Sequence, residues 1–411
     1  MWNLYSVKYS KNHKKINFCG IKLNRRLNYN KEFKRLKNLP VQGNKVIFSN
    51  FCDKNFGCNP KYIALELLKQ NVNYDLVWLV NPNLTDEELD IPSGIRVVKN
   101  EYPNVIEELA TAKIWISNVR LIKYFKKGLE KRNGQFYIQT WHGALGIKKI
   151  DGDANPKFWE RSTWNGFEEI DSKSVDYLIS NSSFENSVYK SAFWNRGEIK
   201  ELGHPRNDIF FYDSGDIRKH VYSRLGIDPS KKIVLYVPSY RDNDRLYCYF
   251  MDYERIVQAC REKWGGEWVM CIRLHPRAAK YADKILMPSD NIIDCSKYPD
   301  IQELLVSADC AITDYSSCIF DYLLSGKPAF IYARDLAEFD EERGFYYPFS
   351  ETPMSVAQTD NELAENIKSF DCISYKHKVN EFLKGKGCID DGQASKRVAE
   401  LIKYIVFNQA Q

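Results

Sequence analysis

Residues 310–317 read Cys-Ala-Ile-Thr-Asp-Tyr-Ser-Ser, a short apolar run that passes directly into polar side chains. Such a run is typical of a buried strand, and the polar residues stand where that strand would end. Three other predicted strands end in the same way. Their polar clusters are Trp141-His142-Gly143, Pro238-Ser239-Tyr240-Arg241-Asp242-Asn243 and Leu274-His275-Pro276. Because ligands bind at the carboxyl ends of strands in open parallel sheets, the four clusters predict one shared cleft.

The pattern at residues 310–317 repeats along the chain, because short apolar runs alternate with amphipathic stretches from residue 45 onward. This alternation predicts an α/β protein with parallel sheets and helices on both faces. The first series of predicted strands is Val46–Ser49, Leu76–Val80, Ile95–Val98, Ile114–Ser117, Phe136–Thr140 and Tyr177–Ser180. The second series is Ile233–Val237, Trp268–Arg273, Ile292–Asp294, Cys310–Thr313 and Ala329–Tyr332. Two such series indicate two Rossmann-like domains that face each other.

Domain limits follow from two loop patterns, Asp213–Asp216 and Gly226–Ser230, which flank a basic helical stretch at residues 217–225. A chain of 411 residues is long enough for two domains of ordinary size. We therefore expect a basic arm, an N-terminal Rossmann-like domain, a C-terminal Rossmann-like domain and a final helix that packs back across the first domain. Their expected bounds are residues 1–40, 41–215, 226–390 and 391–411.

Composition and charge narrow the class of protein. The net charge of +5 does not require a nucleic-acid partner, and neither an RNP-like motif nor a zinc-binding spacing supports one. We expect no transmembrane helix, because no stretch of about 18 residues is free of charge, and no signal peptide, because the N-terminus lacks an apolar core. The eleven cysteines form no Cys-x-x-Cys pair, which is typical of reduced thiols in an intracellular protein.

The N-terminal segment is strongly basic. Residues 1–40 contain eleven Lys or Arg residues and one acidic residue, Glu32, with aromatic and aliphatic residues interleaved. A segment of this kind suits an anionic membrane surface. The alternatives are a solvated or loosely packed arm and, ranked lower, an RNA-binding segment.

His142 and His275 stand at predicted strand ends, each beside a residue that fixes the backbone. Imidazole titrates near pH 7, so one ring is a candidate base for an acceptor hydroxyl and the other a candidate ligand of a phosphate group. Phosphoryl transfer depends mostly on positioning and charge stabilisation, which makes Arg241, Arg273 and Arg277 natural helpers. The alternative for each histidine is a purely structural role. A third candidate, His204, lies in the segment Gly203-His-Pro-Arg-Asn-Asp208.

Two polar segments beside predicted helices are candidate phosphate sites. Thr313–Ser317 opens a predicted helix at residues 318–324, and Asp390–Ser395 leads into the last one, at residues 394–407. Free backbone N–H groups, hydroxyl donors and the helix dipole suit a diphosphate, whereas the alternative is an ordinary helix cap.

Two Asp-x-Asp spacings are candidate metal sites, Asp151-Gly-Asp153 and Asp242-Asn-Asp244. Such pairs can hold a divalent metal, for example Mg²⁺, beside a diphosphate, although chance also produces them in a chain with 54 acidic residues. The sequence contains no GxxxxGK[ST] loop, which disfavours a P-loop kinase, and no GxSxG elbow.

Taken together, these segments resemble the CDP-glycerol glycerophosphotransferase family, the polymerases and primases of teichoic acids and some capsules. The order and spacing of these segments and several uncommon short motifs agree with the family pattern over residues 136–400. The segments that carry the resemblance are Gln139–Gly143, Gly203–Asp208, Leu235–Asn243, Arg273–Pro276, Ile312–Ser317, Phe320-Asp321, Gly326–Pro328, Arg343–Phe345, Asp391-Gly392 and Ala394-Ser395. Two departures concern Ala144-Leu145, where members often read Thr-Pro, and a long extra N-terminal domain of some polymerases, which we expect to be missing. The first affects the acceptor side more than the donor side.

The resemblance implies a GT-B-like α/β fold in which two Rossmann-like domains with parallel sheets face an interdomain cleft. It places the CDP moiety in the C-terminal domain and the acceptor in the N-terminal one, and it makes His142 and His275 the catalytic pair, with His142 as the base. The residues expected at the donor phosphates are Arg241, Arg273, Thr313, Asp314, Ser316, Ser317 and Ser395. Further expected site residues are Gly143, His204, Arg206, Asp208 and Pro238.

On this basis we expect an enzyme that transfers glycerol phosphate from CDP-glycerol, or a related CDP-polyol, to a hydroxyl of a lipid-linked polymer or glycan and releases CMP. The resemblance implies a peripheral protein at the inner face of the cell membrane. Two alternatives stay open: a GT-B nucleotide-sugar glycosyltransferase of capsule or lipooligosaccharide synthesis, and a membrane-peripheral scaffold without activity. Residues 14–23 also resemble short basic stretches in enzymes of Gram-negative capsule and lipooligosaccharide clusters, which favours a capsule or surface-glycan context.

Overall fold

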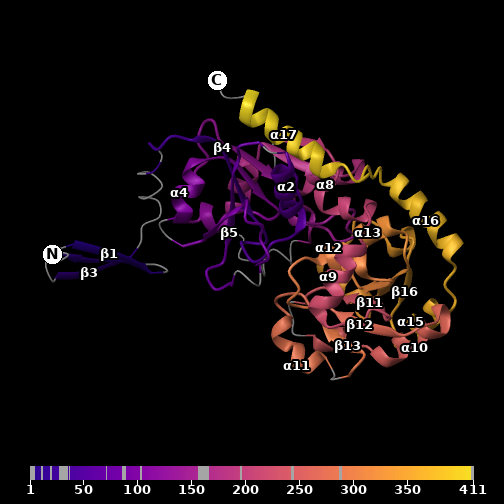
Figure 1. Ribbon diagram of the computed structural model, residues 1–411. Coiled ribbons are helices and arrows are strands. Elements are labelled where there is room, and N and C mark those ends of the chain that lie inside the picture. The colour runs from indigo at the N-terminus through magenta and orange to yellow at the C-terminus, as the bar shows by residue number, and fades with distance from the viewer. Residues whose placement is uncertain are drawn as a thin grey trace.

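The structure is a computed structural model, and most of the described chain forms two α/β halves, each built on its own sheet (Figure 1). The architecture confirms the predicted α/β class with two parallel sheets. The structure describes residues 36, 38–70, 72–85, 89–101, 104–155, 166–194, 197–241, 245–286 and 289–408, and the strands at residues 5–10, 13–18 and 21–26.

The sheet of the N-terminal half has seven parallel strands in the order β10-β9-β8-β7-β4-β5-β6. Its central strands are buried on both faces, as expected for a parallel sheet that helices cover. The strands are β4 (Gln42–Ser49), β5 (Asp75–Val80), β6 (Arg96–Lys99), β7 (Ala112–Ser117), β8 (Phe136–Gln139), β9 (Tyr177–Ser180) and β10 (Glu198–Glu201). The helices are α2 (Cys58–Lys69), α4 (Asn104–Thr111), α5 (Ile122–Phe125), α7 (Phe167–Ser174) and α8 (Ser183–Ala192).

The sheet of the C-terminal half has six parallel strands in the order β13-β12-β11-β14-β15-β16. The strands are β11 (Lys232–Val237), β12 (Trp268–Ile272), β13 (Ile292–Asp294), β14 (Cys310–Thr313), β15 (Ala329–Tyr332) and β16 (Ser355–Ala357). The helices are α9 (Gly215–Leu225), α10 (Tyr253–Trp264), α11 (Ala282–Ile285), α12 (Ile301–Ser307), α13 (Cys318–Tyr322), α14 (Leu336–Arg343), α15 (Asp360–Lys368) and α16 (Cys372–Gly385).

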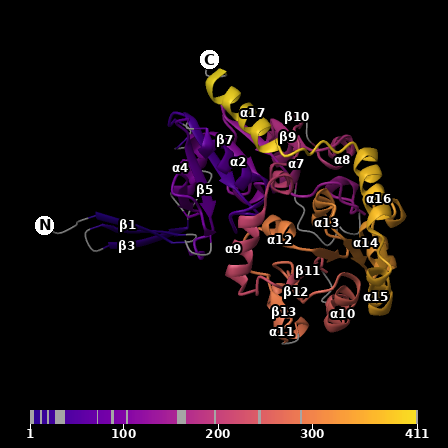
Figure 2. The ribbon, with the colours of Figure 1, turned by 45° about the vertical axis from the view of Figure 1, so that its right-hand side comes forward.

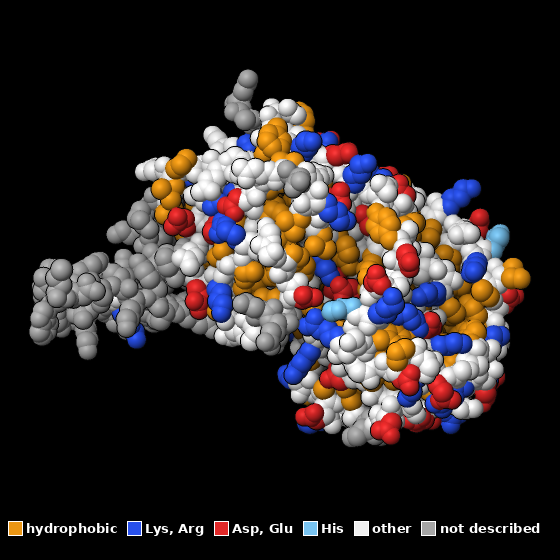
Figure 3. All heavy atoms as spheres, in the orientation of Figure 1, with side chains coloured by type: hydrophobic (Ala, Val, Ile, Leu, Met, Phe, Trp, Pro, Cys, Tyr) orange, Lys and Arg blue, Asp and Glu red, His pale blue; other side chains and the backbone are white. Residues whose placement is uncertain are grey.

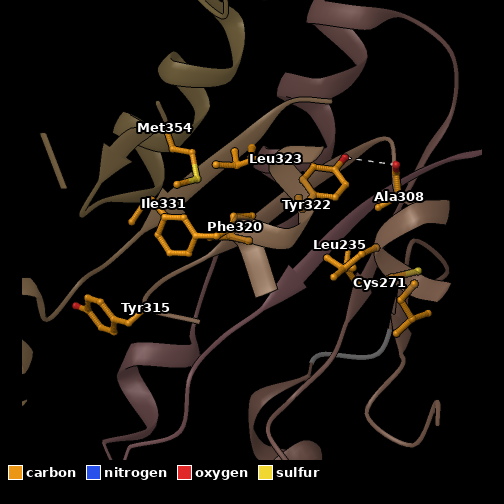
Figure 4. Packing of buried hydrophobic residues seen from close by; sticks show 14 of the residues in the cluster. Leu235, Cys271, Ala308, Tyr315, Phe320, Tyr322, Leu323, Ile331 and Met354 are labelled. Carbon is orange, nitrogen blue, oxygen red and sulfur yellow. Dashed lines mark hydrogen bonds between the residues drawn. The ribbon is translucent and has the colours of Figure 1, made fainter. Parts of the chain in front are cut away.

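Aromatic side chains form much of the core between this sheet and its helices. Phe320 and Tyr322 of α13 pack with Met354 and with Ile331 of β15 (Figure 4). The hydroxyl of Tyr322 donates a hydrogen bond to Ala308 O at 3.4 Å, so the polar end of this buried ring has a partner. The core thereby fixes the end of β14 and the start of α13, where the predicted site lies.

The predicted strands are confirmed, because each of them corresponds to a strand of the two sheets. The sequence pattern did not predict β10 and β16, each of which lies at an edge of its sheet. β10 has the sequence Glu-Ile-Lys-Glu and contains no fully buried residue. An edge strand pairs on one side only and faces water, so its sequence need not form the apolar run that marks a central strand.

A third, antiparallel sheet precedes the N-terminal half and lies apart from both halves in Figures 1 and 2. It consists of β1 (Tyr5–Ser10), β2 (His13–Phe18) and β3 (Ile21–Arg26). The sequence predicted only a basic arm here, because the run of charges hid the strand pattern. Its contact with a membrane surface stays a prediction.

The last helix, α17 (Ala394–Asn408), runs back over the N-terminal half, as predicted (Figure 2). Val398, Ala399 and Ile402 are fully buried in the core of that half. The chain therefore crosses between the halves twice, once before α9 and once before α17. The predicted domain limits at residues 215, 226 and 390 stay a prediction.

None of the described helices is both long and apolar enough to cross a lipid bilayer. The ten cysteines in the described part of the chain are free thiols, and most of them are buried. The buried ones pack as small apolar side chains.

Candidate active site

Three of the predicted polar clusters lie side by side at one edge of the C-terminal sheet. β12, β11 and β14 are neighbours in this sheet, and the clusters 273–276, 238–241 and 314–317 follow them directly. Ser239 N donates to Asp314 Oδ1 at 2.8 Å, which joins the loops after β11 and β14. The carboxyl ends of the three strands thus form one surface, as the sequence predicted.

The fourth cluster, residues 141–143, follows β8 in the N-terminal half and reaches the same loops. A Cβ atom built on Gly143 would lie 3.1 Å from Ser317 Oγ, and one on Gly146 would lie 3.2 Å from Ser317 Cβ. The two loops are therefore in contact, and the lack of a side chain at Gly143 permits it. On the face shown in Figure 3, lysine and arginine side chains gather beside a histidine where the halves meet.

Residues 143–150, which we call the docking segment, continue onto the C-terminal half. Leu145 and Ile147 are buried in the core of that half. Tyr346 N donates to Ile147 O at 2.8 Å, and the hydroxyl of Tyr347 donates to Leu145 O. Both halves therefore hold the loop that carries His142.

A backbone carbonyl fixes the proton of His142. Nδ1 of this ring lies 2.7 Å from Asn118 O, and because a carbonyl can only accept, Nδ1 carries the proton. Nε2 therefore presents a lone pair. Asn118 is itself held by Phe51, whose N donates to Asn118 Oδ1 at 2.8 Å. The rings of Phe51 and Trp141 pack on the imidazole at centroid distances of 5.4 and 4.5 Å.

His275 has the opposite arrangement. Its Nδ1 accepts a hydrogen bond from Arg277 N at 3.1 Å, so the proton of the neutral ring is on Nε2. The side chain is exposed and packs against Tyr240, with ring centroids 5.3 Å apart. One histidine thus offers a proton acceptor and the other a donor.

Both rings are neutral at pH 7. Burial lowers the pKa of His142 to about 4, and the charges of Arg206 and Lys148 act in the same direction. Although His275 is exposed as a residue, its imidazole loses part of its hydration against the surrounding loops, which lowers its pKa to about 4, and the charges of Lys148 and Arg277 lower it further. A proton gained by His275 would lower the pKa of His142 further, so the two rings share one electrostatic environment.

Arg241 is buried between two carboxylates. Its Nε lies 2.7 Å from Asp335 Oδ2, and its Nη2 lies 2.9 Å from Asp314 Oδ2. The guanidinium also lies over the rings of Tyr315 and Phe339. With its donors engaged in this way, Arg241 holds the loops after β11 and β14 together, as does Asp314. Arg241 and Asp314 were predicted to contact the donor phosphates, but in the structure they hold the loops in position.

The hydroxyl groups of residues 313–317 differ in their partners. Thr313 Oγ1 donates to Val237 O at 2.5 Å and joins the backbone network of the sheet. Ser316 Oγ donates to Cys318 Sγ at 3.2 Å, which is a weak acceptor. Ser317 precedes α13, yet its side chain makes no capping hydrogen bond. The alternative of an ordinary helix cap therefore does not describe Ser317.

Arg273 lies half-buried at the end of β12. Its Nη1 donates to Tyr298 O at 2.5 Å, and burial lowers its pKa. Pro238 is buried directly after β11 and starts the loop that leads to Arg241. One donor of the Arg273 guanidinium is thus used within the protein, on the segment after β13.

The segment from Gly203 onward builds a different part of the molecule. His204 is buried, with Nε2 2.9 Å from Glu185 Oε2. Arg206 is buried against Asp321, with Nε 2.9 Å from Oδ2. These contacts join α8 and α13 to the segment between the halves. The structure therefore gives His204 and Arg206 structural roles, although the charge of Arg206 still reaches His142.

The predicted phosphate site before α17 is filled by a carboxylate of the protein. Asp208 accepts hydrogen bonds from Ala394 N at 2.9 Å and from Ser395 N at 2.7 Å. Ser395 Oγ donates to Pro205 O at 3.3 Å. Ser395 and Asp208 were predicted to lie at a phosphate site. In the structure Asp208 instead caps the N-terminus of α17, which contains Ser395.

The predicted metal pairs receive no support. Asp151 pairs with Arg120, and Asp153 Oδ2 accepts from the Tyr346 hydroxyl at 2.9 Å. The second pair, at residues 242–244, lies outside the described residues. Across the ranges that the structure describes, no group of three or more His, Cys, Asp or Glu side chains could hold a metal ion.

Two residues that the sequence analysis did not single out belong to the site. Asn118 directly follows β7, so the strand-end rule applied to it as well. Lys148 lies in the docking segment, and its charge acts on both histidines. No motif marks such a lysine, because its environment comes from segments that are distant in the sequence.

The chain is similar to known proteins along most of its length. The family model described as CDP-Glycerol:Poly(glycerophosphate) glycerophosphotransferase matches residues 32–404. A teichoic acid poly(glycerol phosphate) polymerase of Staphylococcus epidermidis is 30% identical over 386 residues, which cover 88% of this chain and 51% of that protein. A teichoic acid glycerol-phosphate transferase of Staphylococcus aureus is 30% identical over 390 residues, which cover 90% of this chain and 95% of that protein.

A solved structure of the wall teichoic acid polymerase TagF matches with a TM-score of 0.77 and 28% identity, covering 93% of this chain and 95% of that chain. This likeness confirms the predicted GT-B-like fold. The chain spans about half the length of the poly(glycerol phosphate) polymerases of Staphylococcus epidermidis and Bacillus subtilis. Because the named relatives are teichoic acid proteins, the comparisons do not favour the capsule context expected from residues 14–23.

Proposed function

The chain belongs to the CDP-glycerol:poly(glycerophosphate) glycerophosphotransferase family, and from this premise we propose that it transfers glycerol phosphate from CDP-glycerol to a hydroxyl of a polymer acceptor, with release of CMP. The observation that carries the proposal is the pair of neutral histidines with opposite hydrogen-bonding capacity, His142 and His275. Such a transfer needs one group that accepts a proton and others that stabilise charge on the phosphate.

His142 is the general base in this proposal. An acceptor hydroxyl within hydrogen-bond reach of Nε2 gives its proton to that nitrogen while its oxygen attacks the phosphorus that bears the glycerol. The bond from this phosphorus to the bridging oxygen breaks, so that oxygen leaves with CMP and the acceptor gains glycerol phosphate. The carbonyl of Asn118 keeps Nδ1 protonated and stabilises the imidazolium that forms.

His275 and the nearby hydroxyls hold the donor. Nε2–H of the neutral His275 ring donates to a phosphate oxygen, and Arg273, Ser316 and Ser317 add further donors to the same group. Arg241 acts through the loops that it holds in place. Charge on the phosphate is thus stabilised by groups that are positioned before the donor binds.

The donor belongs to the C-terminal half, residues 226–390, and the acceptor to the N-terminal half, residues 41–215. Three of the four polar clusters lie on the C-terminal sheet, which supports the first assignment. His142 comes from the N-terminal half, which supports the second, because the base has to reach the acceptor.

Incubation of the purified chain with a donor panel and a glycerol phosphate polymer tests the proposal, with CMP as the measured product. The panel contains CDP-glycerol, CDP-ribitol, a UDP-sugar and a GDP-sugar. Acceptor-dependent release of CMP from CDP-glycerol is the expected result. Turnover of a nucleotide sugar without turnover of CDP-glycerol would establish the glycosyltransferase alternative. A melting temperature that no CDP ligand raises would favour the scaffold.

The proposed place of work is the inner face of the cell membrane, where a lipid-linked acceptor would be met. The eleven Lys and Arg residues of residues 1–40 support this location, at roughly 1 kcal/mol for each cation near an anionic surface. Removal of residues 1–40 should weaken binding to vesicles with anionic lipid, and neutral vesicles are the control. Binding that does not change would contradict the membrane role of this segment.

A further inference from the structure

Lys148 lies where the two halves are in contact. It belongs to the docking segment, and its backbone forms an antiparallel bridge with Phe345 of the C-terminal half. The next hydrogen bond along the pair, from Tyr346 N to Ile147 O, is 2.8 Å long. The position of Lys148 is therefore fixed relative to both halves.

Among the described residues Lys148 has no carboxylate within ion-pair distance, in contrast to two buried lysines. Lys45 Nζ lies 2.9 Å from Glu108 Oε2, and Lys61 Nζ lies 3.0 Å from Asp300 Oδ2. Lys148 is half-buried and forms no ion pair with any carboxylate among the residues that the structure describes. Removing an ammonium group from water is costly without an opposite charge, so an unpaired lysine of this kind is typical of one that binds an anionic ligand.

The groups that act on Lys148 come from the loops of the proposed site. Burial lowers the pKa of Lys148 to about 7, and the charges of Arg343 and Arg241 lower it as well. Asp314 and the thiol of Cys318 act in the opposite direction. The net environment is electropositive, which attracts an anion with more than one charge.

Lys148 is also linked to the other candidate ligands of the phosphates. Its charge lowers the pKa of both His142 and His275. Gly146, which precedes it by two residues, lies in contact with Ser317. An anion that meets Ser317 and both imidazoles is therefore within the field of this ammonium group.

We propose that Lys148 binds the diphosphate of the nucleotide donor, so that the N-terminal half contributes a cation to a ligand that the C-terminal half otherwise holds. The inference rests on the function proposed above. The diphosphate supplies the opposite charge that Lys148 lacks, and the amine takes up a proton from the buffer when the donor binds.

Calorimetric titration of the full chain with CDP-glycerol, CDP and cytidine tests this proposal. Lys148→Met removes the charge but keeps an apolar side chain, so the affinity for CDP-glycerol and CDP should fall about 10- to 100-fold, as expected for the loss of a hydrogen bond to a charged group. The affinity for cytidine, which has no phosphate, should not change. Lys148→Arg keeps the charge and should retain most of the affinity.

Lys149→Met is the matched control, because it removes the neighbouring positive charge while the backbone hydrogen bond from Lys149 N to Gly344 O is kept. This variant should bind all three ligands as the wild type does. Titrations in two buffers that differ in ionisation enthalpy should show proton uptake with CDP-glycerol for the wild type and not for Lys148→Met.

The outcomes separate this inference from the proposed function. Equal binding of CDP-glycerol by the wild type and by Lys148→Met overturns the inference alone. Equal losses for cytidine and CDP-glycerol also overturn it, because the lysine then supports the nucleoside pocket. A wild-type chain that binds no cytidine nucleotide overturns the proposed function, and the inference with it.

Discussion

At the scale of single residues, one backbone group selects the chemical role of each histidine. The carbonyl of Asn118 keeps the proton of His142 on Nδ1, whereas the N–H of Arg277 keeps the proton of His275 on Nε2. The sequence placed both rings at strand ends but could not distinguish them, because the tautomer depends on which backbone group faces Nδ1. The tautomers therefore support the proposed roles of His142 as base and His275 as hydrogen-bond donor, and the sequence motif alone does not define these tautomers.

Replacement of either histidine by alanine should lower kcat about 10²- to 10⁴-fold, the range attributed to general acid–base catalysis. Melting temperatures should stay close to that of the wild type, because His275 is exposed and His142 is half-buried. CMP release under saturating CDP-glycerol is the measurement. His377→Ala, on the exposed face of α16, is the control and should keep full activity. Wild-type rates in both variants would exclude the proposed pair.

The acid limb of the pH profile should lie unusually low. A base works only when deprotonated, and because burial lowers the pKa of His142 to about 4, its active form persists to lower pH than that of an ordinary imidazole. The ratio kcat/KM should therefore show no decrease from about pH 7 to about pH 5 and should fall only below that, whereas a ring with a pKa of about 6.5 would already lose most activity at pH 5. A midpoint near 6.5 would contradict the proposed environment of His142.

At the scale of elements, a buried ion pair holds the strand-end loops in register. Arg241 follows β11 and reaches Asp335, which precedes α14, and Asp314, which follows β14. The hydrogen bond from Ser239 N to Asp314 closes the same network. Loops from adjacent strands are thereby locked together, which positions the hydroxyls of Ser316 and Ser317 before any donor binds.

Asp335→Ala should lower the free energy of unfolding by about 3–5 kcal/mol, because it leaves the buried guanidinium of Arg241 without a full set of opposite charges. CDP-glycerol binding should weaken as well, since the loops after β11 and β14 lose their fixed spacing. Urea unfolding followed by circular dichroism measures the first effect.

A surface pair provides the matched control for Asp335→Ala. Lys173→Ala removes the exposed pair with Glu169 on α7 and should change the free energy of unfolding by less than about 0.5 kcal/mol. If the two substitutions had equal effects, the Arg241 network would have no special role in stability.

At the scale of the whole molecule, each half contributes a segment to the core of the other. The docking segment places Ile147 in the core of the C-terminal half, and α17 places Ile402 in the core of the N-terminal half. Both side chains are fully buried. Separating the halves would expose apolar surface on each, so we expect them to unfold together.

Ile402→Ala should lower the free energy of unfolding by about 2–5 kcal/mol, because it leaves a cavity in the N-terminal core. Its effect should also reach the C-terminal half. Hydrogen exchange of β5 and β12 amides in increasing urea should show one shared transition that shifts in the variant. Val97→Ala, an exposed position on β6, should leave the transition where it is. Separate transitions for the two strands would contradict the coupling.

The sequence predicted where the site lies in the fold better than it predicted the contacts of individual side chains. Strand-end clusters after β8, β11, β12 and β14 meet as expected, and His142 and His275 lie among them. Arg241, His204 and Ser395 were expected at the ligand, yet each is engaged by a partner far away in the chain. A motif records that a residue type recurs in a given order, and it does not record whether a carboxylate from another element already occupies its donors.

The sequence by itself determined the two parallel sheets and the places where polar loops emerge from them. Apolar runs and their periodicity are local properties, and burial of those runs leaves few alternative arrangements. Only the tertiary structure decided the short edge strands, the exchange of segments between the halves, the tautomers of the two histidines and the lack of an ion pair at Lys148 among the described residues. These depend on contacts between residues far apart in the chain, and such contacts form only when the packed core fixes distance and dielectric environment together.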